Sequence, residues 1–335
     1  MGVKQCEGAC PMLGWALLRF ARTRQFVVAP ELAGPLDRVV RSSLEVSWGQ
    51  ARSWIASGKV RVGGEVVREP TVRVAAGAEV TFEEHAPRQR GRGDAVPAQT
   101  DVVHVDGQIV VVNKPAGVST VPYDGEEDDT LDARVRGWLA RQGQAPRGVR
   151  PSLGVVHRLD KETTGLLVFT RTWLAKQSLT SQFRRHTVHR RYLAIAHGDV
   201  RSRTIRSYLL ADRGDGLRGS ARGAAARRGE AAKEAVTHVE RLESFGGATL
   251  VACRLETGRT HQIRVHLSEA GHPLLGERVY VRGYGGALLA APRVMLHAAE
   301  LGFVHPATER EVRWERGMPE DMVEVVERLR RLSRT

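Results

Sequence analysis

The spacing of apolar residues between positions 36 and 82 changes from helical to strand-like. Two helices are predicted because apolar side chains recur there at helical intervals. These positions are Leu36, Val39, Val40, Ala51, Trp54 and Ile55. Ser47 is a suitable N-cap for the second helix, and Gly58 ends it. From Lys59 the period becomes two, and Gly63-Gly64 provides the positive φ values of a hairpin turn before VTF closes the unit.

From Val102 onward, strand-like and helix-like segments alternate, which indicates a mixed α+β fold. The strand-like segments include IVVVNK, GLLVFT, RYLAIAHG and ATLVACRLETG, and a last amphipathic helix begins near Pro319. The apolar positions of that helix are Met322, Val325, Val326, Leu329 and Leu332. Consecutive strands without helices between them argue against a doubly wound nucleotide-binding sheet, and neither GxGxxG nor GxxxxGK[ST] occurs. The pattern therefore implies neither ATP nor NAD.

Two segments lack apolar periodicity and divide the chain. EEHAPRQRGRGDAVPAQT reads as a flexible linker, and the Arg/Gly-rich stretch 213–230 is predicted to be a mobile surface loop without core-forming residues, whose arginines could touch phosphates. The predicted organisation is a poorly ordered extension over residues 1–27, a small domain over 28–85, a linker over 86–100 and a larger domain over 101–335. A length of 335 residues suits two such domains.

Charge points to a polyanionic partner. Lysine and arginine outnumber acidic residues by 51 to 38, giving a net charge of +13 and a pI near 10.4. Such a balance attracts nucleic acid, although a GC-rich coding sequence also enriches arginine. Three scattered cysteines exclude a disulfide framework, and Cys6 and Cys10 have no matching pair for a metal site. The apolar run near the N-terminus is too short to cross a membrane, so a cytoplasmic protein is expected.

Residues 36–82 resemble the S-four RNA-binding domain. LDRVV, GQARSWIASGKVRVGGEVV and the VTF end carry this likeness. In that family the two helices and the turn into the hairpin present basic residues to RNA, which here implies Arg38, Arg41, Arg52 and Lys59. The alternative is a solvated basic surface on a dimerisation or linker module.

The segment HRLDKETTGLLVF, residues 157–169, places a carboxylate between cations just before an apolar run. It closely resembles motif II of the RluA family of pseudouridine synthases, whose invariant aspartate matches Asp160. The likeness continues, in the family's order, through VVVNKPAGVSTVP, RRYLAIAHG, LETGRTHQIRVHLSEAGHPLLGERVY and LHAAELGFVHP. It therefore covers nearly the whole of the larger domain, which is expected to have the family's mixed, mainly antiparallel sheet.

This resemblance implies isomerisation of uridine to pseudouridine in RNA, without a cofactor or metal. Asp160 would be the essential catalytic residue, and attack on the sugar, attack on the base and removal of a sugar proton all remain open for it. Taken alone, HRLD would also fit an ion pair of Asp160 with Arg158 or Lys161. Tyr192 matches the family's active-site tyrosine, which can stack on the base or assist proton removal. Arg264 matches the basic partner that would keep the aspartate ionised.

Four further residues are expected to contact the substrate. Arg158 would lie near a flipped nucleotide, and Lys114 would line the cleft unless it belongs to a simple structural turn. Arg259 would hold phosphate or replace Arg264 as the partner of the aspartate. Ile263 is expected on the core-facing side of its helix and also among the substrate contacts.

The sequence favours an RNA pseudouridine synthase acting on large-subunit ribosomal RNA as a monomer. The alternative is a non-catalytic RNA-binding or ribosome-assembly protein, which would be free to lose one of the matched site residues. A glycoside hydrolase is disfavoured because the carboxylate is unpaired and aromatic residues make up only 5% of the chain. His261 and His266 lack the i, i+4 spacing of a zinc pair, so no metal is predicted.

Overall fold

The computed structural model describes residues 23–84, 100–122, 127, 129–144, 151–212, 217–221 and 232–333. The chain divides into two compact units, Met1–Asp94 and Ala95–Thr335, and this boundary lies inside the predicted linker 86–100. Residues 1–22, which form most of the predicted extension, and residues 86–99 of the linker lie outside the described residues.

The first unit contains two helices and short strands. Its elements are β1 (Thr23–Val27), the 3-10 helix η1 (Pro30–Leu32), β2 (Gly34–Pro35), α1 (Leu36–Leu44), α2 (Trp48–Ala56), β3 (Val60–Val62), β4 (Glu65–Val66), β5 (Arg73–Val74) and β6 (Glu79–Glu83). One sheet has the order β1-β6-β3-β4, and β2 pairs with β5. This arrangement confirms the predicted two helices followed by a hairpin.

Local sequence explains the boundaries of these elements. The Ser47 hydroxyl accepts a hydrogen bond from the Gln50 amide at 3.2 Å and so caps α2. Gly63 and Gly64 have φ values of 58° and 83°, as a two-residue turn between β3 and β4 requires. One expectation was wrong: Thr23–Val27, assigned to a poorly ordered extension, pairs along β6. Strand β6 supplies the partner for this short segment, and its sequence alone does not reveal that.

The second unit is built on one large sheet. Its strands are β7 (Asp101–Val105), β8 (Ile109–Lys114), β9 (Gly154–Val155), β10 (Thr164–Thr170), β11 (His189–His197), β12 (Arg203–Leu210), β13 (Gly219–Ser220), β14 (Lys233–Ser244), β15 (Ala248–Leu255), β16 (Leu296–Val304) and β17 (Glu311–Glu315). The order is β13-β12-β14-β15-β11-β16-β10-β8-β7, with β17 beside β16 and β9 beside β10. Only β10 and β16 pair in parallel among the described strands, so the sheet is mixed and mainly antiparallel, as predicted.

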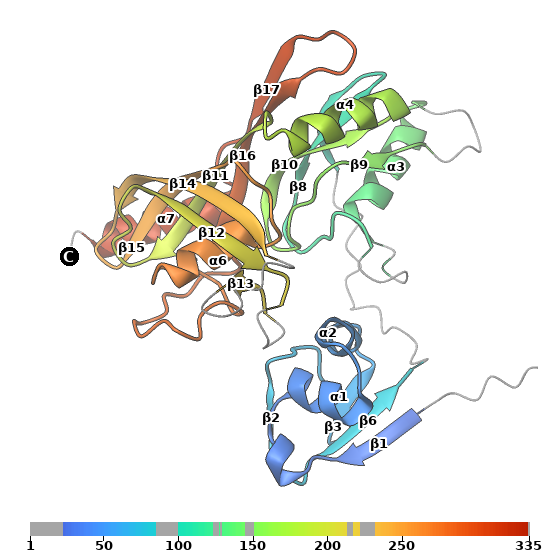
Figure 1. The fold of residues 1–335 in the computed structure, drawn as a ribbon, viewed down its shortest axis with the longest axis vertical. Coiled ribbons are helices and arrows are strands. Elements are labelled where there is room, and N and C mark those ends of the chain that lie inside the picture. The colour runs from blue at the N-terminus through green and yellow to red at the C-terminus, as the bar shows by residue number, and fades with distance from the viewer. Residues whose placement is uncertain are drawn as a thin grey trace, which may run out of the picture. The chain divides into compact units, whose positions relative to one another are not determined.

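Helices cover both faces of this sheet. They are α3 (Leu131–Arg141), α4 (Trp173–Arg184), α6 (Gln262–Glu269) and α7 (Glu320–Leu332). Figure 1 shows α3 and α4 beside the β8–β10 end, and α6 and α7 beside the β12–β15 end. Leu167 and Phe169 pack with α3, whereas Leu166 and Val168 pack with α4. Because strand side chains alternate between faces, burial on both faces explains the continuous apolar run of β10.

Gly165 begins this run for a steric reason. Its φ is 111°, and a Cβ at this position would lie 2.3 Å from the carbonyl oxygen of Ala298 on β16. A glycine is therefore required where β10 comes closest to its parallel neighbour. The position fixes the path of the chain directly after Asp160.

Two expectations about the second unit need correction. Leu332 is 62% exposed, whereas the other predicted apolar positions of α7 are buried. Within the predicted surface loop 213–230, Leu217 is buried against Leu209 and Tyr280, and β13 pairs with β12. Tertiary contacts thus place a core residue inside a stretch of Arg/Gly-rich composition. The remainder of that loop, residues 213–216 and 222–230, lies outside the described residues.

Candidate active site

Asp160 lies on the loop between β9 and β10. The Thr120 hydroxyl donates to the Leu159 carbonyl at 3.0 Å and accepts from the Leu159 amide at 3.2 Å. The Thr163 amide donates to the Asp160 carbonyl at 3.1 Å. The backbone on both sides of the carboxylate is therefore fixed by hydrogen bonds, which is the rigid support that a reacting group needs.

Lys114 holds the same loop from beneath. Its Nζ donates to the carbonyl oxygens of Pro115, Val118 and Lys161 at 2.7–2.8 Å, and the residue is 1% exposed. Burial lowers the pKa of Lys114 to about 7, although nearby carboxylates oppose this shift. Lys114 was expected to contact the substrate. Its ammonium group instead donates all three of its hydrogen bonds to carbonyl oxygens of the protein. Lys114 therefore fits the alternative prediction, in which it belongs to a structural turn.

Arg264, on α6, connects Asp160 to a second carboxylate. Its Nη1 lies 3.4 Å from Asp160 Oδ2, while its Nε and Nη2 donate to Glu277 at 2.7 and 2.8 Å. Burial works against the charge of Arg264, but the contacts with Glu277 and Asp160 raise its pKa above the ordinary value. The guanidinium is thus held by Glu277 and presents its remaining edge to Asp160.

His261 stands on the other side of the carboxylate. Its Nε2 lies 3.8 Å from Asp160 Oδ1, and its Nδ1 is hydrogen-bonded to the Tyr280 hydroxyl at 2.7 Å. The residue has a φ of 59° at the start of α6, a conformation that costs energy for a side chain other than glycine. Burial lowers the pKa of His261 to about 4, and the charge of Asp160 only partly offsets this. A neutral imidazole therefore faces the carboxylate at neutral pH.

Tyr192 lies on β11, directly after an irregularity of that strand. The register between β11 and β16 shifts between Arg191 and Tyr192, a bulge of the kind that re-aims a side chain. Burial is the main reason that the pKa of Tyr192 is raised; the charge of Arg190 lowers it, and the charge of Asp160 raises it. The residue is 8% exposed, and with its pKa raised the hydroxyl is protonated at neutral pH.

The other predicted substrate contacts differ in their surroundings. Arg158 is exposed. Arg259 Nε donates to the Glu234 carbonyl at 2.9 Å, and the residue lines a cavity. It forms no described ion pair with Asp160. Ile263 is 4% exposed and packs in the main core, as expected for the core-facing side of its helix, while its substrate contact stays a prediction. Of the two candidate cations, Arg264 and not Arg259 meets Asp160.

The basic residues of the first unit are only partly available to a ligand. Arg38 and Arg41 are exposed on α1. Arg52 pairs with the buried Asp37 at 2.8 Å, and its guanidinium lies 5.3 Å from the Trp48 ring centre. Arg41 stacks over the same ring at 5.1 Å, and Lys59 is half-buried. Arg52 therefore has a structural partner in Asp37. The Trp48 ring lies under both Arg41 and Arg52, so these two arginines form one cationic surface around it.

The described residues contain no group of three or more His, Cys, Asp or Glu side chains arranged to hold a metal ion. His261 contacts Tyr280 and His266 contacts Thr237, so the two histidines face different surroundings. No helix within the described part of the chain is both long and apolar enough to span a bilayer. The sole described cysteine, Cys253, is buried, which raises the pKa of its thiol to about 12.

Comparisons with known proteins define the class of this fold and site. Residues 108–269 match the family model described as RNA pseudouridylate synthase, and residues 34–80 match the S4 domain. The protein is thus an isomerase with an RNA-binding module. A ribosomal large subunit pseudouridine synthase D from Zymomonas mobilis is 37% identical over 90% of this chain and 95% of its own length. The chain belongs to the RNA pseudouridylate synthase family.

Other relatives agree with this assignment. An uncharacterized RNA pseudouridine synthase of Bacillus subtilis, YlyB, is 38% identical over 87% of this chain and 92% of its own length. Among solved structures, human RNA pseudouridylate synthase domain containing 4 matches with a TM-score of 0.54 and 26% identity, over 69% of this chain and 93% of that one. The predicted resemblance to this family and to the S-four domain is confirmed.

Three residues of the site were not predicted as functional: Glu277, Tyr280 and His261. All three lie within the motif that contains Arg264, so a signal for them existed in the sequence. What the sequence lacks is the fold of the loop after α6, where the amides of Arg278, Val279 and Tyr280 donate to Glu277 Oε1. Those bonds turn the carboxylate inward to Arg264.

Proposed function

We propose that this protein isomerises uridine to pseudouridine in large-subunit ribosomal RNA, with Asp160 as the essential catalytic carboxylate. The observation that carries the proposal is the pairing of Asp160 with Arg264 at 3.4 Å, on a loop fixed by Thr120 and Lys114. Relatives named for activity on the large ribosomal subunit support the choice of substrate. Action in the cytoplasm as a monomer is part of the same proposal.

The arrangement fits the chemistry of the reaction. The bond between the base nitrogen and the sugar breaks, the base rejoins through carbon 5, and the proton on carbon 5 leaves. A carboxylate fixed beside a cation can act as nucleophile or base toward the sugar. In this proposal Tyr192, on β11, supplies a ring and a protonated hydroxyl for contact with the extruded base. Arg158, exposed on the loop, is proposed to contact the flipped nucleotide.

The test is the variant Asp160→Asn, which keeps the side-chain volume and removes the charge. Release of tritium from carbon 5 of labelled uridine in a large-subunit RNA transcript should fall roughly a hundredfold or more, with RNA binding retained. Glu162→Gln is the matched control, because it makes the same charge change two residues away. A rate for Asp160→Asn within tenfold of wild type would refute the assignment. Mapping pseudouridines in ribosomal RNA from a deletion strain would then identify the target.

The alternative, a non-catalytic RNA-binding protein, predicts a different outcome. It requires that the wild-type protein bind the transcript without releasing tritium, and that a deletion strain keep every pseudouridine. The intact set Asp160, Tyr192 and Arg264 weighs against it, because a protein that only binds RNA would be free to lose one of these residues.

A further inference from the structure

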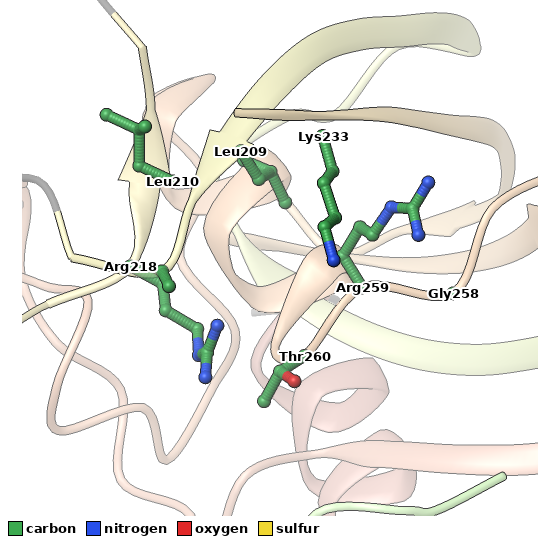
Figure 2. Close-up of a pocket in the computed structure, with 8 residues that line it drawn as sticks. Leu209, Leu210, Arg218, Lys233, Gly258, Arg259 and Thr260 are labelled. Atoms are coloured by element: carbon green, nitrogen blue, oxygen red, sulfur yellow. The ribbon is translucent and has the colours of Figure 1, made fainter. Parts of the chain in front are cut away.

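A cavity of about 240 Å³ opens beside the start of α6. One wall is apolar and consists of residues 209–211 at the end of β12. The other walls carry Arg218, Lys233 and Arg259, together with the turn formed by Gly258 and Thr260. Figure 2 shows the Lys233 side chain extending toward this turn, and Arg218 coming from the separate segment that precedes β13. Three cations from different parts of the chain thus line one hollow.

Two of these cations lack a carboxylate partner in the described part of the chain. Within the described residues, neither Arg218 nor Lys233 has a carboxylate at ion-pair distance. The nearby Glu234 pairs with Arg206, and Glu269 accepts from the Ser220 amide at 2.8 Å. Cations in a concave site with an apolar wall produce a focused positive potential, because the low-dielectric wall screens them less than open water does.

A fourth cation stands behind the cavity wall. Arg190 is 6% exposed; its Nη2 donates to the Glu256 carbonyl at 3.0 Å, and its Nε has no hydrogen-bond partner among the described residues. A Cβ on Gly258 would lie 2.6 Å from Arg190 Nη1, so the cavity wall is glycine where the buried guanidinium approaches it. A buried guanidinium without a described carboxylate partner is costly, and a bound anion nearby would reduce that cost.

The cavity is connected to Asp160 through the start of α6. Thr260 lines it, and the next residue, His261, has its Nε2 3.8 Å from Asp160 Oδ1. The charge of Arg218 also reaches this histidine: burial is the main reason that the pKa of His261 falls, and Arg218 lowers it further. A strand of RNA with one nucleotide at Asp160 would therefore have this hollow available to a neighbouring phosphate.

We propose that this cavity binds backbone phosphates of the RNA next to the nucleotide that reacts at Asp160. The inference rests on the proposed function and adds a subsite to it. Lys233 and Arg218 supply the charge, Thr260 a hydroxyl donor, and the glycine turn allows close approach of a phosphate. Arg259 has its Nε engaged by a carbonyl and therefore also holds the turn in place.

The test compares Lys233→Met and Arg218→Met with Arg330→Met. Arg330 is an exposed arginine of α7 that already pairs with Glu243 at 2.7 and 2.8 Å, so the control loses the same net charge away from the cavity. We measure binding of a large-subunit RNA transcript across salt concentrations, together with KM and kcat. Circular dichroism checks that each variant is folded.

Each cavity variant should raise KM roughly tenfold, with a smaller effect on kcat, because a charge-assisted hydrogen bond to a phosphate disappears from both ground and transition state. The slope of log affinity against log salt should become shallower by roughly 0.7 to 0.9 for each phosphate that is no longer neutralised. Arg330→Met should leave both quantities near wild type. Equal slopes and KM values for cavity variants and control would overturn the proposal.

Two further measurements are needed. One distinguishes RNA phosphates from free phosphate, and the other distinguishes failure of the cavity assignment from failure of the proposed function. Calorimetry with inorganic phosphate reports a site for free phosphate; binding that both cavity variants abolish, with their RNA affinity unchanged, would overturn the assignment to RNA. If wild-type protein does not convert the transcript, the proposed function fails, but the salt slopes still decide whether the cavity contacts RNA. If it converts the transcript and only the slopes fail to change, the cavity assignment alone is wrong.

Discussion

The variant Glu277→Gln tests whether the second carboxylate supports the site. Glu277 is fully buried, Arg264 is 9% exposed, and two hydrogen bonds at 2.7 and 2.8 Å join them. Replacing the carboxylate by an amide of the same shape leaves the guanidinium buried without its main counter-charge. Removal of one partner of a buried pair costs about 3–5 kcal/mol. For a unit of this size, that cost lowers the melting temperature by roughly 6–20 °C.

The control is a pair with the same geometry in water. Asp129 binds Arg134 through two bonds at 2.6 and 2.7 Å, and its side chain is 69% exposed. Asp129→Asn should therefore change the free energy of unfolding by less than about 1 kcal/mol. Urea titration of both variants with intrinsic tryptophan fluorescence measures the difference. Equal decreases of stability in the two variants would refute this reasoning, because burial would then not matter.

A double variant separates stability from catalysis. Arg264→Met with Glu277→Gln removes both charges, while the glutamine carbonyl oxygen can still accept from the amides of Arg278, Val279 and Tyr280, and such a neutral replacement of a buried pair is often tolerated. We expect the melting temperature to recover relative to Glu277→Gln. Tritium release should stay low, because Asp160 no longer has its cation. Recovery of turnover along with stability would show that the buried pair serves the fold only.

Three other predictions follow from the structure. Tyr192→Phe should bind RNA normally and turn over slowly in single-turnover assays, and full activity would limit Tyr192 to packing. His266 and His297 are each 1% exposed with a pKa lowered from 6.5 to about 4, mainly by burial. Between pH 6.5 and pH 4 the unfolded chain binds more protons at these histidines than the folded protein does. The free energy of unfolding is therefore highest above pH 6.5 and decreases as the pH falls toward 4, by about 2 kcal/mol per histidine at pH 5. Urea midpoints that do not change between pH 7.5 and pH 5 would contradict this. Deleting residues 1–85 should weaken RNA binding and make the slope of log affinity against log salt shallower by roughly 0.7 to 0.9 for each phosphate that the first unit neutralises. Turnover at saturating RNA should remain near that of the full chain. A large loss of this rate in a core that is still folded would contradict the prediction.

Local patterns were sufficient to predict the elements that depend on local chemistry. The cap at Ser47, the Gly63-Gly64 turn and the buried face of α7 follow from residue type and spacing. The strand β1 was missed because its stability depends on pairing with β6, more than fifty residues later. Leu217 was missed for a similar reason, since composition reports the surroundings of a segment only on average.

The site shows the same limit for charged residues. The pairing of Asp160 with Arg264, 104 positions apart, was expected from family resemblance and not from any local pattern. Arg52 appeared to be a surface cation, but it pairs with an aspartate that is 1% exposed. Lys114 was expected in a cleft, and its ammonium is enclosed by carbonyls. A sequence states the charge of a side chain, whereas its partner is decided by tertiary contacts.

The basic residues fall into two groups. Some are largely bonded within the protein and position the site, whereas others have donors that a ligand could use. Lys114 and Arg264 are buried, and protein oxygens occupy the Lys114 donors and most of the Arg264 guanidinium. Such groups cannot turn toward a substrate without leaving buried oxygens unsatisfied, so they fix the loop that carries Asp160. Arg158 and Lys233 are exposed, and among the described residues neither has a carboxylate partner. These side chains give up only hydration when they meet a phosphate, so they are the cations that we propose to contact RNA.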